Sequence, residues 1–330
     1  RESVQIAEIE TFGCPEWTPD GSAIIYRVRE GDIQTLVWYD LASGAVSSIV
    51  DANHRLEWAW SPDGERLAIG GDDILIHDSE TGTTTNITQT PDINEFMPQW
   101  SPDGDILVFQ GGFNQSVYVY QNGETREIFS EAKDILREPQ ISPDGNWVGW
   151  EVLGDDNRSG IQIALYDLRN DAGRFIESPP NTVLELNLWL PESDGVIFRR
   201  VDIFDFTSEL LTYDLATEYV LPLTDDLNMI EANLEIAPDD SAIIYQVFAI
   251  NTPGDLKRQP DIGRGLADIA LYDFETHRQL TDTPNIDERP LSWSPDSRTV
   301  VLQVREEDAE AFYLALLDVE SGTITPLTNT

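Results

Sequence analysis

The sequence has little positive charge, and this scarcity excludes whole classes of partner. Of its 330 residues only 20 are Lys or Arg, against 61 Asp or Glu, which gives a formal net charge of -41. Nucleic-acid binding needs a basic footprint for the phosphates, and anionic membrane surfaces attract basic segments for the same reason. The composition therefore indicates no nucleic-acid partner and no attachment to or insertion into a membrane.

Cysteine and histidine are equally scarce. The single cysteine, Cys14, excludes an internal disulfide and a cysteine-based metal cluster, and we expect it to be a small buried apolar residue. The only histidines are His54, His77 and His277, too few for a histidine-rich metal site. No run reaches the roughly 18 apolar residues of a membrane-spanning helix. The first residues are neither an initiator Met nor a signal peptide, so we expect a soluble, processed chain.

What the sequence does contain is a short phrase that recurs along the whole chain. Its aspartates, or the equivalent acidic position, fall at 20, 63, 103, 144, 194, 239 and 296, a period of about 40 residues with insertions. That period is the length of a four-stranded propeller blade. The copies are Trp17-Thr-Pro-Asp-Gly21, Trp60-Ser-Pro-Asp-Gly64, Trp100-Ser-Pro-Asp-Gly104, Ile141-Ser-Pro-Asp-Gly145, Trp189-Leu-Pro-Glu-Ser-Asp-Gly195, Ile236-Ala-Pro-Asp-Asp240 and Trp293-Ser-Pro-Asp-Ser297.

The chemistry of this phrase predicts a tight turn between two strands. Ser, Pro, Asp and Gly each suit one of the four positions of a type I turn, in the order found at Ser61 to Gly64. We therefore interpret the aspartates as turn residues. The repeated Trp is interpreted as a wedge between neighbouring blades, since a large aromatic residue fills a tapering core. A second phrase, seen at Leu165-Tyr-Asp-Leu168, predicts the end of each third strand.

With its Trp-Ser-Pro-Asp-Gly and Tyr-Asp-Leu phrases the chain resembles the TolB-like propellers, relatives of the WD-repeat proteins, from about residue 12 to 328. The resemblance implies an all-β, seven-bladed β-propeller of four-stranded antiparallel blades and a single domain over residues 1–330. The predicted repeats are residues 12–51, 52–90, 91–131, 132–178, 179–225, 226–282 and 283–328. It also implies an extracytoplasmic protein, in the periplasm, on the cell surface or secreted.

Residues 1–11 fall outside these repeats and predict an extra N-terminal strand, because Val4 to Glu10 alternates in polarity. Both this segment and Thr323 to Leu327 could supply the outer strand that closes the ring. We expect closure within one chain first. The alternative is strand exchange with another copy, which would make the protein a self-assembling extracellular subunit, a homo-oligomer through its terminal strand.

Insertions concentrate at one end of the predicted blades, opposite the tight turns, and this end is the predicted binding surface. The longest insertion, residues 251–266, concentrates positive charge in an acidic chain. Either it docks a partner or its arginines pair with acidic neighbours. Asp155 and Asp156 lie in the insertion at 154–160, and Asp202 begins the one at 202–207. The candidate partner-binding residues are Lys257, Arg258, Arg264, Asp155, Asp156 and Asp202.

A second group of candidates stands five residues before the Trp position, where each blade begins. Glu95, Glu231 and Glu288 occupy it in three repeats and Arg55 in another, and we place these four at the mouth of the channel. Carboxylates that converge there could hold a hard cation such as Ca²⁺, which takes six to eight oxygens. Alternatively they are solvated or cap nearby backbone amides.

Signs of catalysis are few. The chain has no Gly-x-Ser-x-Gly nucleophile elbow and no attached hydrolase domain. The leading hypothesis is therefore a non-catalytic scaffold that binds a protein partner through its loop-rich face. The alternatives are the self-assembling subunit and a carbohydrate-active enzyme that uses Glu95, Glu231 and Glu288.

Overall fold

The computed structural model describes most of the chain. The described residues are 15–90, 93–112, 116–130, 139–153, 160–204, 208–224, 229–249, 266–283, 285–307, 309 and 311–328, with the side chains of 229–231 and 249 left aside. Every regular element among them is a β-strand, and none is a helix able to cross a membrane.

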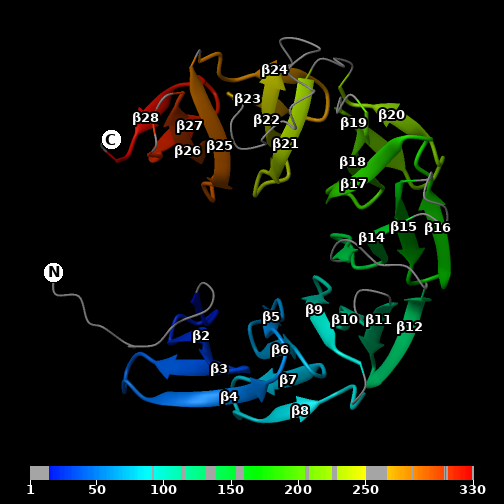
Figure 1. The fold of residues 1–330 in the computed structure, drawn as a ribbon, viewed down its shortest axis with the longest axis vertical. Coiled ribbons are helices and arrows are strands. Elements are labelled where there is room, and N and C mark those ends of the chain that lie inside the picture. Colours follow the sequence, from blue (N-terminus) through cyan, green and yellow to red (C-terminus); the bar gives the residue numbers. More distant parts are fainter. Residues whose placement is uncertain are drawn as a thin grey trace. The chain divides into compact units, whose positions relative to one another are not determined.

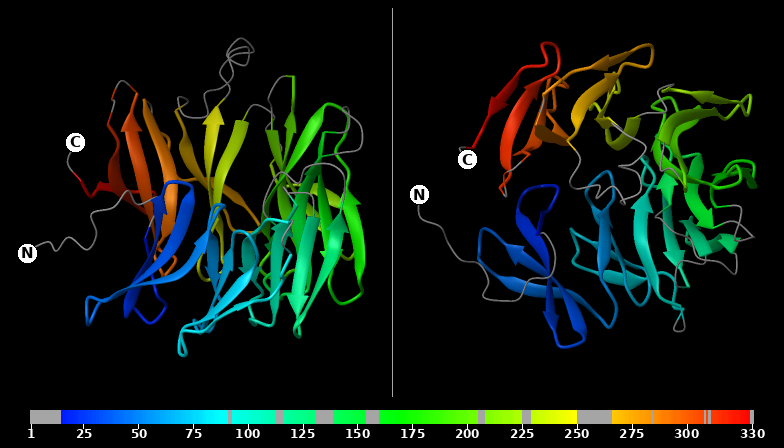
Figure 2. Two further views of the ribbon diagram at one scale, coloured as in Figure 1. Left: turned by 60° about the horizontal axis from the view of Figure 1, so that its bottom comes forward. Right: turned by 45° about the horizontal axis from the view of Figure 1, so that its top comes forward.

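The strands form seven sheets of four (Figures 1 and 2). The first four sheets contain β1 (Glu16–Trp17), β2 (Ala23–Glu30), β3 (Ile33–Asp40), β4 (Val46–Ala52); β5 (Glu57–Trp60), β6 (Arg66–Gly70), β7 (Leu75–Asp78), β8 (Thr84–Asn86); β9 (Glu95–Trp100), β10 (Ile106–Gly111), β11 (Ser116–Gln121), β12 (Glu124–Ser130); β13 (Gln140–Ile141), β14 (Trp147–Leu153), β15 (Ile161–Asp167) and β16 (Ala172–Ile176).

The last three sheets follow the same order. They contain β17 (Thr182–Trp189), β18 (Gly195–Asp202), β19 (Ser208–Asp214), β20 (Val220–Pro222); β21 (Met229–Ile236), β22 (Ile243–Ala249), β23 (Asp268–Tyr272), β24 (His277–Gln279); β25 (Ile286–Trp293), β26 (Thr299–Glu306), β27 (Tyr313–Asp318) and β28 (Ile324–Pro326). Within each sheet every strand pairs with the next one in sequence, and the paired registers are antiparallel. These sheets are the blades of a seven-bladed β-propeller, which confirms the predicted fold class.

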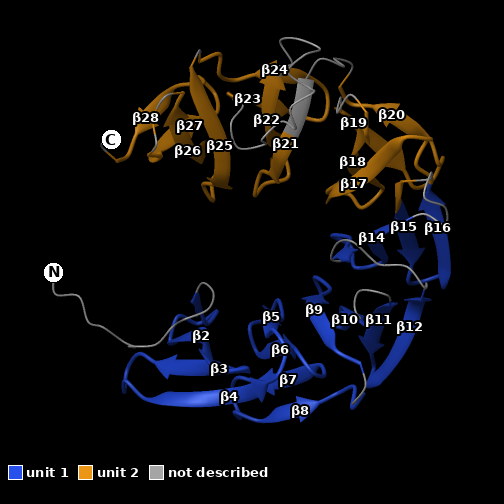
Figure 3. Ribbon diagram, viewed as in Figure 1, with its two compact units in different colours: residues 1–155, 163–176 blue, residues 156–162, 177–330 orange. Residues whose placement is uncertain are grey.

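The chain separates into two compact units, coloured in Figure 3. Unit 1 comprises residues 1–155 and 163–176, which contain the first four blades, and unit 2 comprises residues 156–162 and 177–330, which contain the last three. Residues 1–14 lie outside the described part of the chain, so the expectations for Cys14 and for a strand at 4–10 stay predictions.

The recurring phrase folds as the tight turn that its chemistry predicts. At Ser101 the backbone carbonyl accepts the N–H of Gly104 at 2.8 Å, and the hydroxyl donates to Asp103 Oδ1 at 2.6 Å. The same hydroxyl oxygen accepts the N–H of Ile106 at 2.9 Å as the next strand begins. Gly104 has φ of 73°, a left-handed conformation that glycine adopts without strain. The aspartates are turn residues, as predicted.

Two copies of the repeated Trp pack between neighbouring blades of the same unit, whereas Trp17 is 59% exposed. Trp100 is buried, and its indole N–H donates to the carbonyl of Ala59 in the preceding blade at 3.1 Å. Trp293 makes the equivalent bond to Glu235 at 3.2 Å. Both acceptors stand one residue before the Trp position of their own blade. The predicted wedge role is therefore confirmed for these two blades.

Candidate functional site

The connections between second and third strands lie at the end of each blade opposite the tight turns, and in unit 2 all three present exposed apolar side chains. In the first of them Ile203 is 45% and Phe204 72% exposed. Asp202, predicted as a partner-binding residue, accepts the N–H of Phe204 on Oδ1 at 2.8 Å. It therefore holds the turn that displays this ring.

The other two blades of unit 2 repeat the pattern. Phe312 is 51% exposed just before β27, and the Arg305 guanidinium carbon lies 5.1 Å from its ring centroid. Leu266 is 36% exposed just before β23. In unit 1 two exposed residues border such connections: Ile33 is the first residue of β3, and Leu153 is the last residue of β14. Such side chains are costly to leave in water and are typical of binding surfaces when they gather at one end of a protein.

Sequence reasoning placed the binding surface at this end but missed its apolar side chains. The charged candidates Lys257, Arg258, Arg264, Asp155 and Asp156 lie outside the described residues. The signal for Phe204 was present, because the insertion reads Asp202-Ile-Phe-Asp-Phe206 and places apolar residues where a solvated loop needs none.

The predicted channel-mouth residue Glu95 is buried, with 1% of its surface exposed, at the start of β9. Its Oε2 accepts the backbone N–H of Ile74 at 3.1 Å, and its Oε1 is hydrogen-bonded to the Thr90 hydroxyl group at 2.9 Å. Thr88 donates a further side-chain hydrogen bond. Burial raises the pKa of Glu95 above its usual value, with a smaller contribution from the charge of Asp73. The contacts are those of a cap on a backbone amide, one of the alternatives that the sequence left open.

Glu288 has the same surroundings in unit 2. It is fully buried, it accepts the hydroxyl of Thr281 at 2.5 Å, and it is hydrogen-bonded to the hydroxyl group of Thr283 at 2.7 Å. Burial again raises the pKa of this glutamate, and the neighbouring Asp268 and Asp287 raise it further. The two glutamates share a sequence pattern, Thr-x-Thr-Pro-x-x-x-Glu, at residues 88–95 and 281–288.

The other two channel-mouth candidates differ from this pair. Arg55 is exposed, and its Nε lies 3.2 Å from Glu57 Oε1. Glu231 is a residue of β21 that pairs with Val247, and its side chain lies outside the described part. Across the described residues, no three or more His, Cys, Asp or Glu side chains are grouped so as to hold a metal ion.

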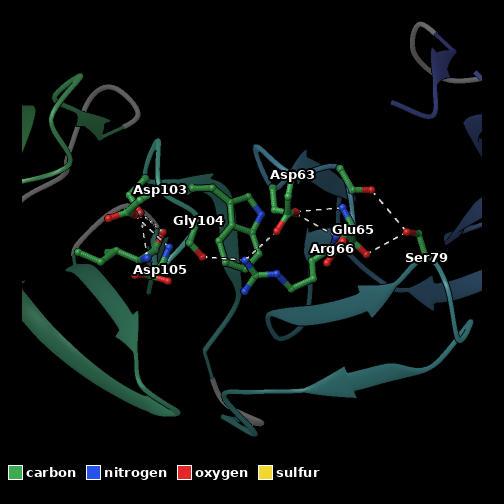
Figure 4. Close-up of polar contacts among 12 residues, drawn as sticks. Asp63, Glu65, Arg66, Ser79, Asp103, Gly104 and Asp105 are labelled. Carbon is green, nitrogen blue, oxygen red and sulfur yellow. Dashed lines mark hydrogen bonds and ion pairs between the residues drawn. The ribbon is translucent and has the colours of Figure 1, made fainter. Parts of the chain in front are cut away.

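At the tight-turn end, two blades of unit 1 are joined by the polar contacts that Figure 4 shows. Arg66 donates from its guanidinium to the carbonyl of Gly104 at 2.8 Å and lies 4.5 Å from the ring centroid of Trp100. Its guanidinium is also 3.7 Å from Asp63, whose carboxylate accepts the N–H of Glu65 at 3.0 Å. The Asp63 carboxylate is therefore engaged in contacts within and beside its own turn.

Comparison with known proteins identifies the repeat. A family model described as the TolB beta propeller domain matches residues 4–202. A search of curated protein sequences gives no match.

Solved structures with a similar fold include both lyases and peptidases. An oligogalacturonate lyase in complex with manganese is 15% identical with a TM-score of 0.59, over 97% of this chain and 85% of the lyase. Dipeptidyl peptidase 4 from Porphyromonas gingivalis is 13% identical with a TM-score of 0.67, over 96% of this chain and 53% of the peptidase. A prolyl endopeptidase is 12% identical with a TM-score of 0.60, over 95% and 49%. The chain thus spans about half the length of the two peptidases. At such identities the likeness establishes the fold alone.

Proposed function

The chain belongs to the TolB β-propeller domain family, and from that premise we propose that it is a non-catalytic module that binds a protein partner through the connections between its second and third strands. The observation that carries the proposal is the set of exposed apolar side chains in those connections of unit 2, with Phe204 the most exposed. Aromatic anchors of this kind dominate the binding energy of protein interfaces.

The contacts of the carboxylates support a binding role over a catalytic one. Glycoside chemistry needs two carboxyl groups that flank a substrate. Glu95 and Glu288 are buried, and hydrogen-bonded threonine hydroxyls occupy their oxygens. The proposal places this module outside the cytoplasm. A bound Ca²⁺ ion, and the alternative function of self-assembly through a terminal strand, stay predictions from the sequence.

The function can be tested by placing a photo-crosslinking phenylalanine analogue at residue 204 or 312 in the native host. We expect both positions to crosslink to the same protein. The matched control is residue 219, because Tyr219 is 70% exposed but lies in the hairpin between third and fourth strands, at the tight-turn end. Binding of the purified partner, measured by calorimetry, is then expected to weaken at least about thirtyfold in Phe204→Ser, the size of a hot-spot loss.

Crosslinking at residue 219 alone, or undiminished binding by Phe204→Ser, would contradict the proposed surface. Turnover of an oligosaccharide by the purified protein, lost in Glu95→Gln or Glu288→Gln, would replace the binding module with the carbohydrate-active enzyme.

A further inference from the structure

The buried Glu95 shares one hydroxyl group with a second carboxylate. Thr90 Oγ1 lies 2.9 Å from Glu95 Oε1 and 3.3 Å from Asp73 Oδ1. A threonine hydroxyl carries a single proton, so it can donate to one of these oxygens only. If both carboxyl groups were ionised, one of the two contacts would bring two acceptors together without a hydrogen between them.

Asp73 has further donors besides the Thr90 hydroxyl. Asp73 Oδ1 also accepts the backbone N–H of Thr90 at 2.7 Å, and Asp73 Oδ2 accepts the side-chain amide of Asn86 at 2.7 Å. Asp73 is therefore well supplied with donors. A proton on Glu95 Oε1 completes the chain, because Glu95 then donates to Thr90 Oγ1 and the Thr90 hydroxyl donates to Asp73.

The same arrangement recurs in unit 2. Thr283 Oγ1 lies 2.7 Å from Glu288 Oε1 and 3.4 Å from Asp268 Oδ1. Asp268 Oδ1 accepts the backbone N–H of Thr283 at 3.0 Å, and its Oδ2 accepts the side-chain amide of Gln279 at 3.1 Å. Each contact has its counterpart in unit 1.

We propose that each of these two Asp–Thr–Glu clusters holds one proton on its glutamate, and that releasing this proton as the pH rises loosens the segment that joins two blades. Proton release can loosen this segment because each cluster holds three parts of the chain together. In unit 1 the aspartate precedes β7 of one blade, the threonines follow β8, and Glu95 begins β9 of the next blade.

Of the titratable groups that face the glutamates, the carboxylates oppose their ionisation. Asp73 and the phenol of Tyr118 face Glu95. Asp268, Asp287 and the phenol of Tyr313 face Glu288, and Asp287 is itself paired with Arg305 at 3.1 Å. Burial raises the pKa of both glutamates above the ordinary value of a glutamate. A folded pKa above the unfolded one means that the clusters stabilise the fold most at low pH, and that this contribution is lost as the pH rises through the folded pKa.

The experiment follows the carboxyl carbons of ¹³C-labelled glutamate by NMR as a function of pH. Two resonances are expected to titrate above the range of ordinary glutamates, one absent in Glu95→Gln and the other in Glu288→Gln. In the same samples, hydrogen exchange reports the Ile74 and Ile269 amides, which donate to Thr88 Oγ1 at 3.0 Å and Thr281 Oγ1 at 2.8 Å. Their protection factors should fall with rising pH by about tenfold for each unit of pKa elevation.

Glutamine keeps a donor directed at the threonine hydroxyl, so each variant should keep the protection of its own amide across the pH range. Asp103→Asn, a change of the same chemistry in an exposed turn, should leave both titrations in place. Two resonances that titrate like ordinary glutamates in the wild-type protein would overturn the proposal without recourse to any variant, as would protection factors that are unaffected by pH.

Discussion

The tight turns and the Asp–Thr–Glu clusters use the same chemical pair, a carboxyl group beside a hydroxyl, with opposite electrostatic results. At the turns the hydroxyl of Thr18 donates to Asp20 at 2.6 Å, and the pKa of this exposed aspartate falls from 3.8 to about 2. In the cluster the hydroxyl oxygen of Thr90 lies 2.9 Å from Oε1 of the buried Glu95, yet the pKa of this glutamate rises. Exposure makes the difference, because water and turn amides stabilise the ionised aspartate whereas burial penalises the ionised glutamate.

These opposite shifts predict a stability maximum at mildly acidic pH, and this is the largest effect that we expect. The pKa values of the turn aspartates Asp63, Asp103, Asp144, Asp239 and Asp296 are also lowered, first by hydroxyl hydrogen bonds at most of them. A lowered folded pKa gives stability that is present above the unfolded pKa and is lost as the pH falls toward 2. Denaturant unfolding across pH 2 to 9 measures both limbs of the profile.

A free energy of unfolding that falls at low pH but not at high pH would contradict this prediction. It would leave the turns with their depressed pKa values and the clusters with no pH-dependent contribution.

Glu288→Ala is expected to have the next largest effect, a loss of about 2 kcal/mol in the free energy of unfolding at pH 5. The change leaves the hydroxyl of the buried Thr281 without its acceptor, and an unsatisfied buried group costs about 1–3 kcal/mol. Urea unfolding monitored by tryptophan fluorescence measures it.

The control for this variant is Glu65→Ala, which removes an exposed side chain of the same type and should change stability by no more than about 0.5 kcal/mol. Equal losses in the two variants would show that burial of Glu288 contributes nothing to its role.

The turns were predictable from the sequence, and the clusters were predictable only in part. Ser101 to Gly104 is read correctly because the hydrogen bonds that shape the turn lie within six residues, so local chemistry decides the structure. The equivalence of Glu95 and Glu288 was visible in the sequence, because the two segments that end in them match. Their burial was not visible, since it depends on Asp73 and Asp268, which belong to a preceding strand connection and come close only when the blade is folded.

The exposed apolar residues were the least predictable part of the candidate site. Phe204 and Phe312 interrupt loops whose neighbours are acidic, and a sequence alone does not reveal whether such a ring turns inward or outward. In the structure Asp202 fixes the turn before Phe204, which decides the question for that residue. The repeats therefore predict the blades and their turns, whereas the orientation of the inserted side chains is known only from the structure.

The smallest expected effect comes from Asp103→Asn, the exposed counterpart of Glu95→Gln. The amide oxygen still accepts from Ser101 and from the N–H of Asp105, which the carboxylate accepts at 3.1 Å, so stability at pH 7 should change by no more than about 0.5 kcal/mol. The acid limb should become slightly shallower, since the variant removes one carboxyl group with a lowered pKa, and the alkaline limb should not change. Glu95→Gln should do the reverse. A matched pair of unfolding profiles therefore assigns each limb to its carboxylates, and a change of the alkaline limb in Asp103→Asn would contradict that assignment.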